Sequence, residues 1–272
     1  MEVNFNMHTH TYRCKHATGT DEEYVLSAIK GGIKTLGFSD HAFFPNIVHE
    51  GMRGDYSELD GYISSINELK RKYKKEVDIK LGFEIEYQEK FYSFYRFLLK
   101  EKGFDFLILG QHLTYDENGR PVYYFRKSNI LEGIINYKND LIKGMKTGLF
   151  LYVCHPDLFM NNVTQITPEI EQVCNEICEA SVKFNIPLEI NLGGVRQRQN
   201  KILFTDQVNC YPSEFFWKIA SNYHVKCIVG IDAHEPKDLE DSKTIDYAID
   251  FAKKYKLNLI TDVKMINTNY LH

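Results

Sequence analysis

The stretch Val3-Asn4-Phe5-Asn6-Met7-His8-Thr9-His10 is an apolar run of strand character that ends in two histidines. It predicts a strand over Val3–His8, and the acidic turn after Thr20 predicts a helix over Asp21–Lys30. Residues two apart on a strand project from the same face, so both imidazoles can reach one metal ion. The stretch therefore predicts a strand-then-helix unit with chemistry at the carboxyl end of its strand.

The same unit recurs along the chain. Further strands are predicted over Thr35–Ser39, Ile79–Glu86, Phe104–Gly110, Leu149–Cys154, Leu188–Leu192 and Lys226–Ile231. Further helices are predicted over Ser57–Lys75, Tyr92–Lys102, Ile130–Lys146, Pro168–Phe184 and Ser213–Tyr223. Strand and helix alternate about seven times, which predicts an α/β fold with a mainly parallel sheet, either open or closed into a barrel.

Histidines and acids gather at the ends of the predicted strands. The donors at or just after strand ends are His8, His10, His16, His41, Glu84, His112, His155, Asp232 and His234. Seven of the ten histidines belong to this set, whereas His49, His224 and His272 are interpreted as surface residues. Because the carboxyl ends of parallel strands in a barrel converge on one active site, this distribution indicates a functional site and favours a barrel.

Nine donors exceed the four ligands that a zinc ion normally takes, so the set predicts a multinuclear centre. Imidazole combined with carboxylate suits Zn²⁺, Mn²⁺ or Fe²⁺ better than Mg²⁺ or Ca²⁺. Several such ions about 3.5–4 Å apart can share a hydroxide and clamp an oxyanion, as in hydrolytic phosphatases. Cys14 lies between His10 and His16 and is a further candidate, although the six cysteines as a group are interpreted as free, mostly buried thiols.

The composition argues against several other classes of protein. Apolar residues make up 43% of the 272 residues and no flexible linker interrupts the chain, so we expect a single domain over residues 1–272. A formal charge of −4 argues against a dedicated nucleic-acid binder. Neither a signal peptide nor an apolar run of about 18 residues is present, so we expect a cytoplasmic protein that does not span a membrane.

At the clustered donors the chain resembles the polymerase and histidinol phosphatase (PHP) family, and the likeness spans nearly the whole chain. Its ordered motifs are His8-x-His10, His16, His41, Glu84, His112, His155 and Asp232-x-His234. The resemblance implies a distorted (β/α)7 barrel with a trinuclear metal site at the C-terminal ends of the strands. It implies a first ion held by His8, His10, Glu84 and Asp232, a second by His16, His41 and His234, and a third by His112 and His155 with Glu84 bridging. Glu86 shares a strand face with Glu84 and is the rival carboxylate, or an outer partner of the ligands.

Within the family the chain is most similar to the stand-alone histidinol phosphatases. The supporting motifs are Met52–Tyr56, Gly82–Glu84, Cys154–Leu158 and Asp232–Pro236. This similarity implies hydrolysis of L-histidinol phosphate, a small-molecule phosphate ester of histidine biosynthesis, to L-histidinol and phosphate. The loop Asn191–Arg198 departs from the more regular Gly-x-Arg loop that we expect there, which leaves open which arginine touches the substrate.

The mechanism expected of such a site is attack of a metal-bridging hydroxide on phosphorus, in line with the ester oxygen. The loop residues Arg53, Arg196 and Arg198 are candidates to hold the phosphoryl oxygens with bidentate hydrogen bonds. Either Asp232 or His41 could manage the proton of the leaving alcohol.

Three alternatives stay open. The same site could act on another small phosphate, or on a phosphodiester or nucleotide. A metal-dependent amidohydrolase also opens with His-x-His, but lacks His16 and the paired late histidines. A non-catalytic metal-binding protein would hold metal without turnover of any phosphoester.

Overall fold

The computed structural model describes residues 3–125, 129–199 and 211–266, excepting the side chains of residues 198 and 199. Four parallel strands form one sheet in the order β1 (Phe5–Asn6), β2 (Thr35–His41), β3 (Asp78–Ile85) and β4 (Phe106–Leu109). Three more parallel strands form a second sheet in the order β7 (Leu188–Asn191), β8 (Lys226–Gly230) and β9 (Asn258–Leu259). A short antiparallel hairpin, β5 (Leu113–Tyr115) with β6 (Pro121–Tyr123), follows β4.

Single-residue bridges join the two sheets. Val153 bridges Leu109 of β4 on one side and Leu188 of β7 on the other, and Thr9 bridges Ala233. The strand predicted over Leu149–Cys154 is therefore present only as an extended segment, whose residues 151–154 hydrogen-bond to the backbone on both sides. All three bridges are parallel, so the chain forms a mixed α/β fold around a curled parallel sheet.

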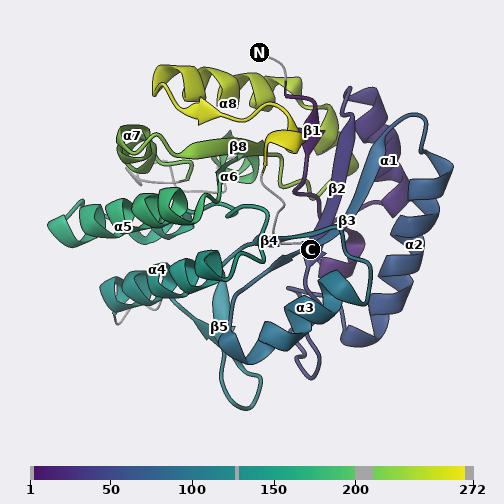
Figure 1. Ribbon diagram of the computed structural model, residues 1–272, viewed down its shortest axis with the longest axis horizontal. Helices are drawn as coiled ribbons and strands as arrows, with labels where there is room; N and C mark the ends of the chain where they lie inside the picture. The colour runs from purple at the N-terminus through teal and green to yellow at the C-terminus, as the bar shows by residue number, and fades with distance from the viewer. Residues whose placement is uncertain (1–2, 126–128, 200–210, 267–272) are drawn as a thin grey trace.

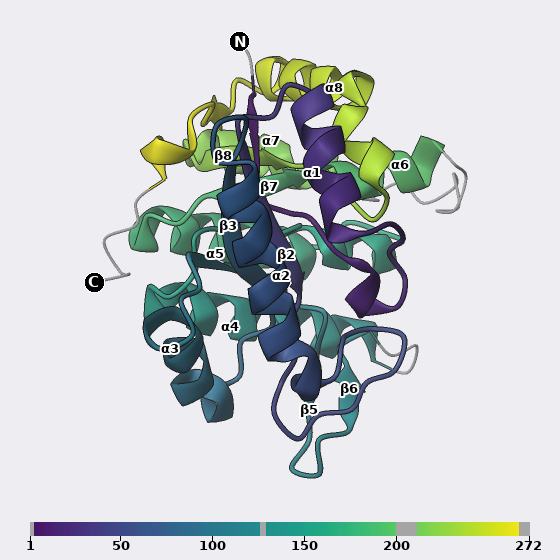
Figure 2. The same cartoon turned by 90° about the vertical axis from the view of Figure 1, so that its right-hand side faces the viewer.

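Helices cover the outer side of this sheet, with α1 and α2 beside β2 and β3, and with α4, α5 and α7 stacked on the opposite flank (Figures 1 and 2). The helices are α1 (Asp21–Lys30), α2 (Leu59–Lys72), α3 (Tyr92–Lys100), α4 (Ile130–Thr147), α5 (Pro168–Phe184), α6 (Leu192–Gln199), α7 (Glu214–Asn222) and α8 (Ser242–Lys254). Short 3-10 turns span Tyr12–Cys14, Tyr56–Glu58, Glu89–Phe91, Leu158–Asn162, Pro236–Glu240 and Val263–Met265. Among the described residues, no helix has both the length and the apolar character needed to cross a bilayer.

The alternation of side chains along the strands divides the core into two parts. Leu107 and Leu109 of β4 belong to the larger cluster, which also contains the buried faces of the helices. Phe106 and Ile108, on the other face of the same strand, belong to a smaller cluster built from segments of both sheets. Successive strand residues point to opposite faces, so the sheet is buried on both sides, as expected of parallel strands.

Most of the predicted elements are confirmed, and their ends differ by a few residues. The helices over Asp21–Lys30 and Pro168–Phe184 have the predicted bounds. Thr20 caps the first of them in a reciprocal capping box with Glu23, as the acidic first turn indicated. β1 is shorter than predicted, and the β5–β6 hairpin, β9, α6 and α8 were not predicted.

Two helical glycines provide a test of this packing. A Cβ on Gly133 of α4 would lie 1.8 Å from the carbonyl oxygen of Tyr124, so Gly133→Ala should lower the free energy of unfolding by about 1–3 kcal/mol. A Cβ on Gly61 of α2 would meet nothing within 4 Å, so Gly61→Ala should raise it by about 0.4–1 kcal/mol. Urea unfolding measures both changes, and a Gly133→Ala variant as stable as the parent would contradict the placement of α4.

Candidate functional site

A cavity of about 790 Å³ opens at the carboxyl ends of the parallel strands. β2 ends in His41, β3 carries Glu84, and Asp232 follows β8. The predicted donors that line the cavity are His10, His16, His41, Glu84, His112, His155, Asp232 and His234. The ninth, His8, is fully buried and contacts three of them. The structure thus brings together all nine donors, although they are spread over more than two hundred positions of the sequence.

Four of the donors, which we call the first donor set, present their atoms at the spacing that a tetrahedral ion needs. Nε2 of His8 lies 3.2 Å from Nε2 of His10. It also lies 3.5 Å from Oε2 of Glu84 and 3.4 Å from Oδ1 of Asp232. Nε2 of His10 lies 3.4 Å and 3.2 Å from the same two carboxylate oxygens. A tetrahedron with metal–ligand bonds of about 2.0–2.1 Å has edges of about 3.3–3.4 Å, so this set fits a zinc-sized ion.

The other oxygen of Glu84 faces a second pair of histidines. Oε1 lies 2.8 Å from Nε2 of His155 and 3.3 Å from Nε2 of His112. The two imidazole rings are 4.9 Å apart between centroids. One carboxylate therefore serves two donor sets, which is the arrangement that a bridging ligand requires.

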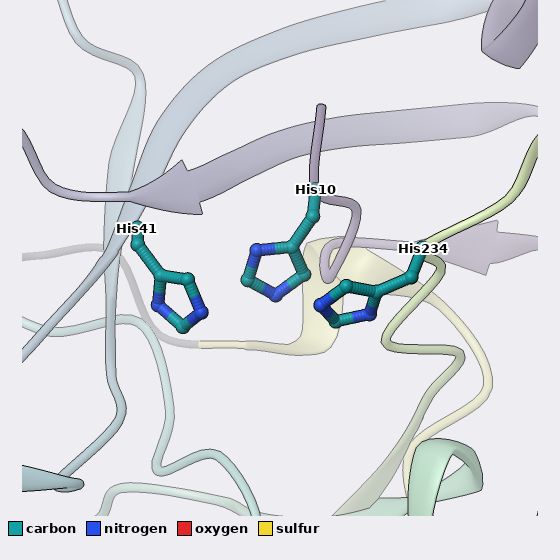
Figure 3. Close-up of side chains that lie close together, drawn as sticks. All are labelled: His10, His41 and His234. Atoms are coloured by element: carbon teal, nitrogen blue, oxygen red, sulfur yellow. The ribbon is translucent and has the colours of Figure 1, made fainter. Parts of the chain in front are cut away.

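A further group of histidines completes the cluster. The ring centroid of His16 lies 5.4 Å from that of His41 and 4.9 Å from that of His234. His10 lies between His41 and His234, and the three imidazoles gather around a shared space (Figure 3). Nδ1 of His16 hydrogen-bonds to the carbonyl oxygen of Cys14 at 2.9 Å, which leaves Nε2 as its free donor atom. The thiol of Cys14 is buried and lies within 4.8 Å of donor atoms of His16 and His234.

The backbone is strained at two of the donors. His155 has a φ of 28° and Asp232 a φ of 53°, in the left-handed region that residues with a side chain seldom adopt. Such conformations persist where surrounding contacts impose them, and they concentrate at functional sites. Both residues follow a strand-like segment, so the sharp turn aims their side chains into the cluster.

The carboxylates and imidazoles of the cluster shift one another's pKa values. Burial alone would raise the pKa of Glu84, but the charges of His112 and His8 outweigh burial and hold that pKa well below its usual value. Burial, with the nearby charge of His10, lowers the pKa of His234 to about 3 and also lowers that of His41.

Other members of the cluster shift in the opposite direction. Burial alone would lower the pKa of His8, but the charges of Glu189, Asp232 and Glu84 outweigh burial and raise that pKa to about 10. Burial would likewise lower the pKa of His155, but its contact with Glu84 raises that pKa. Metal binding at these imidazoles would therefore release protons.

Buried carboxylates stand behind three of the imidazoles, on their Nδ1 sides. The pairs are Asp40 with His10 at 3.7 Å, Glu86 with His112 at 3.2 Å, and Glu189 with His8 at 2.8 Å. Glu86 is thus closer to the role of an outer partner than to that of a ligand. Glu189 was missed in the sequence, although an acid inside the apolar run Leu188-Glu189-Ile190 was a usable signal.

The three candidate arginines occupy different places. Arg196 of α6 lines the cavity, and its Nη2 donates to the carbonyl oxygens of Ile231 and Asp232 at 2.6 and 2.8 Å. Its Nη1 is buried and makes no hydrogen bond within the described part of the chain. Arg53 is also buried, and it donates to the carbonyl oxygen of Ala42 and to Glu86, each at 2.8 Å. The side chain of Arg198 lies outside the described residues.

The histidines interpreted as surface residues differ from one another. His224 is exposed, as predicted. His49 is half-buried in the loop after β2, and its two ring nitrogens hydrogen-bond to the hydroxyls of Tyr115 and Tyr123 at 3.0 Å each, contacts that its interpretation as a surface residue did not include. It ties the loop after β2 to the β5–β6 hairpin. His272 lies outside the described residues.

Curated relatives share most of their length with this chain. It is 24% identical over 237 residues to a probable histidinol-phosphatase of Deinococcus radiodurans, covering 85% of this chain and 86% of that one. It is 22% identical over 258 residues to the histidinol-phosphatase of Bacillus subtilis, covering 85% and 94%.

Two solved structures share the fold. One is a histidinol phosphate phosphatase of Lactococcus lactis, in complex with zinc, L-histidinol and phosphate. Its TM-score is 0.72 at 19% identity, covering 97% of this chain and 99% of that one. The other is a putative histidinol phosphatase of Listeria monocytogenes, with a TM-score of 0.67 at 22% identity, covering 88% and 98%.

The family-level comparison covers most of the site. The PHP domain model matches residues 6–192, a span that includes seven of the nine clustered donors. Because this match takes in more than half of the chain, and because the donors converge as the motifs predicted, the protein belongs to the PHP domain family.

Proposed function

We propose that this protein is a metal-dependent phosphomonoesterase that hydrolyses L-histidinol phosphate to L-histidinol and phosphate. The observation that carries the proposal is the first donor set, whose spacing fits a metal ion and which shares Glu84 with a second set. Family membership supports hydrolysis of a phosphoester. The names of the curated relatives, and the zinc, L-histidinol and phosphate in the Lactococcus lactis complex, support this particular substrate.

The donor sets are suited to three divalent ions of zinc, manganese or iron. The first would be held by His8, His10, Glu84 and Asp232, the second by His16, His41 and His234, and the third by His112 and His155 together with Glu84. Ions bound there would make a water nucleophilic at neutral pH and neutralise charge on the phosphoryl oxygens. The zinc in the Lactococcus lactis structure supports a metal of this type.

The protein's own side chains would bind the phosphate and handle protons. Arg196 has a buried Nη1 without a hydrogen-bond partner beside the donors, where a phosphoryl oxygen could accept from it. Arg198 is a further candidate and lies two residues after Arg196 in α6. Arg53 would not contact the phosphate; it would hold Glu86, which in turn contacts His112. Asp232 and His41 both line the cavity and are the two candidates for the proton of the leaving alcohol.

We also infer that the curled sheet is a distorted (β/α)7 barrel and that residues 1–272 form one domain. The parallel bridges at Val153 and between Thr9 and Ala233 support closure, because they give each of the seven main parallel segments two neighbours. A core that runs from Tyr24 to Ala252 supports a single domain.

Another small phosphate, or a phosphodiester, is the main competing substrate class. A phosphate-release assay with Zn²⁺ or Mn²⁺ distinguishes these substrates from L-histidinol phosphate. It compares L-histidinol phosphate, p-nitrophenyl phosphate and bis(p-nitrophenyl) phosphate. We expect the highest kcat/KM for L-histidinol phosphate and little turnover of the diester. A preference for the diester, or no phosphate release from any monoester, would contradict the proposal.

Glu84→Gln should remove more metal than the loss of a single ligand suggests. Each of its oxygens faces a different histidine pair, so the purified variant should fall from three bound ions toward one, measured by elemental analysis. Glu179→Gln, on the exposed face of α5, is the matched control and should retain the full complement. A Glu84→Gln variant with unchanged metal content would rule out the bridging role.

Arg196→Ala should weaken phosphate recognition. Loss of a charge-assisted hydrogen bond of about 1.5–3 kcal/mol corresponds to a fall in kcat/KM of about 10- to 150-fold. Arg196→Lys, which keeps the charge without the forked geometry, should recover part of that loss. Arg71→Ala, on the exposed side of α2, serves as the control. Steady-state kinetics at matched metal content decide the matter, and wild-type kcat/KM in Arg196→Ala would exclude phosphate contact.

A further inference from the structure

Glu189 is a buried carboxylate in the middle of β7, directly behind the first donor set. It is 0% exposed, and its Oε1 lies 2.8 Å from Nδ1 of His8. Its Oε2 accepts a hydrogen bond from the backbone N–H of His155 at 3.0 Å and another from Nδ2 of Asn191 at 2.9 Å. Both oxygens are therefore occupied, and neither is directed into the cavity.

Among the residues that the structure describes, no lysine or arginine forms an ion pair with Glu189. Within the part of the chain that the structure describes, its ion-pair partner is His8. Burying a carboxylate costs free energy, because the group loses its hydration, so its retention in a core needs an explanation. A metal ion on the far side of the His8 ring would place a lasting positive charge close to this carboxylate.

The neighbouring strand is built to accommodate this carboxylate. A Cβ on Gly230 of β8 would lie 1.7 Å from Oε1 of Glu189, so only glycine leaves room for the side chain there. Gly230 pairs with Asn191, two residues after Glu189. The backbone of β8 thus leaves space for the Glu189 carboxylate beside the His8 ring.

Asn191 extends the contact to a second donor. Its Nδ2 lies 2.9 Å from Oε2 of Glu189 and 3.2 Å from Oδ2 of Asp232. Its Oδ1 accepts from the backbone N–H of Gly194 at 3.1 Å, which fixes the orientation of the amide. Glu189 therefore acts on His8 directly and on Asp232 through Asn191, and these are two of the four members of the first donor set.

We propose that Glu189 is a positioning residue for the ion of the first donor set. It holds the proton of His8 on Nδ1, and so turns the lone pair of Nε2 toward Glu84 and Asp232. A carboxylate placed in this way also makes the imidazole a stronger ligand. The inference rests on the proposed metal centre, but it assigns a role to a residue that does not itself coordinate.

The test compares zinc affinity in the wild type, Glu189→Gln and Glu189→Ala, by competition with a chromophoric chelator. Glu189→Gln keeps the side-chain volume and removes the charge, whereas Glu189→Ala removes every contact. We expect the tightest zinc equivalent to weaken by about 10- to 100-fold, with the larger change in Glu189→Ala. Glu179→Gln, on the exposed face of α5, should bind zinc like the wild type.

Thermal unfolding of the metal-free proteins separates positioning from a purely structural role. We expect metal-free Glu189→Gln to unfold cooperatively near the wild-type temperature, because glutamine keeps the side-chain volume and an oxygen that accepts hydrogen bonds, while the rise in Tm on adding zinc becomes smaller. Unchanged zinc affinity in both variants would overturn the inference, as would a metal-free Glu189→Gln that fails to fold. A wild-type protein that binds no zinc would instead overturn the proposed function.

Discussion

The constraint on which the rest of the structure depends is the crowding of nitrogen and carboxylate donors at the carboxyl ends of the strands. Donor atoms of the first set stand 3.2–3.5 Å apart, as the edges of a coordination tetrahedron do. Buried polar groups at this density destabilise a fold unless something compensates them. Binding of metal ions would supply that compensation, so we propose that the donor cluster and a metal centre are a single feature.

The scaffold around the cluster has visible adaptations to it. His155 and Asp232 adopt left-handed backbone conformations, and the shared carboxylate of Glu84 lies between two histidine sets. Gly110 leaves room for that carboxylate, because a Cβ there would lie 2.1 Å from Oε1 of Glu84. Outer carboxylates such as Glu86 then hold the imidazoles, and Arg53 holds Glu86. Contacts that lie outside the cavity therefore set the orientation of the imidazoles in the cluster.

The sequence predicted that these nine side chains gather at one place, because strand periodicity and strand ends are local properties. His8 and His10 share a face by spacing alone, and the acids and histidines after other strands had to meet at one edge. Strand periodicity could not decide whether Glu84 or Glu86 is the ligand, because both side chains lie on the same face of the strand predicted over Ile79–Glu86. Their distances to the histidines distinguish the two carboxylates. The arginines were harder still, because Asn191–Arg198 was expected to be a loop and is mostly the helix α6, which turns Arg196 toward the cavity. Glu189 stood out only as an acid inside an apolar run, and its partners His8 and His155 are distant in the sequence.

The most direct test of the account is reconstitution of activity in protein stripped of metal with a chelator. Phosphate release from L-histidinol phosphate would be followed while Zn²⁺ is added in known equivalents. The account predicts negligible activity without metal, and a rise that saturates near three equivalents per chain. Full activity in the stripped protein, or zinc bound at the cluster without any phosphate release, would contradict it.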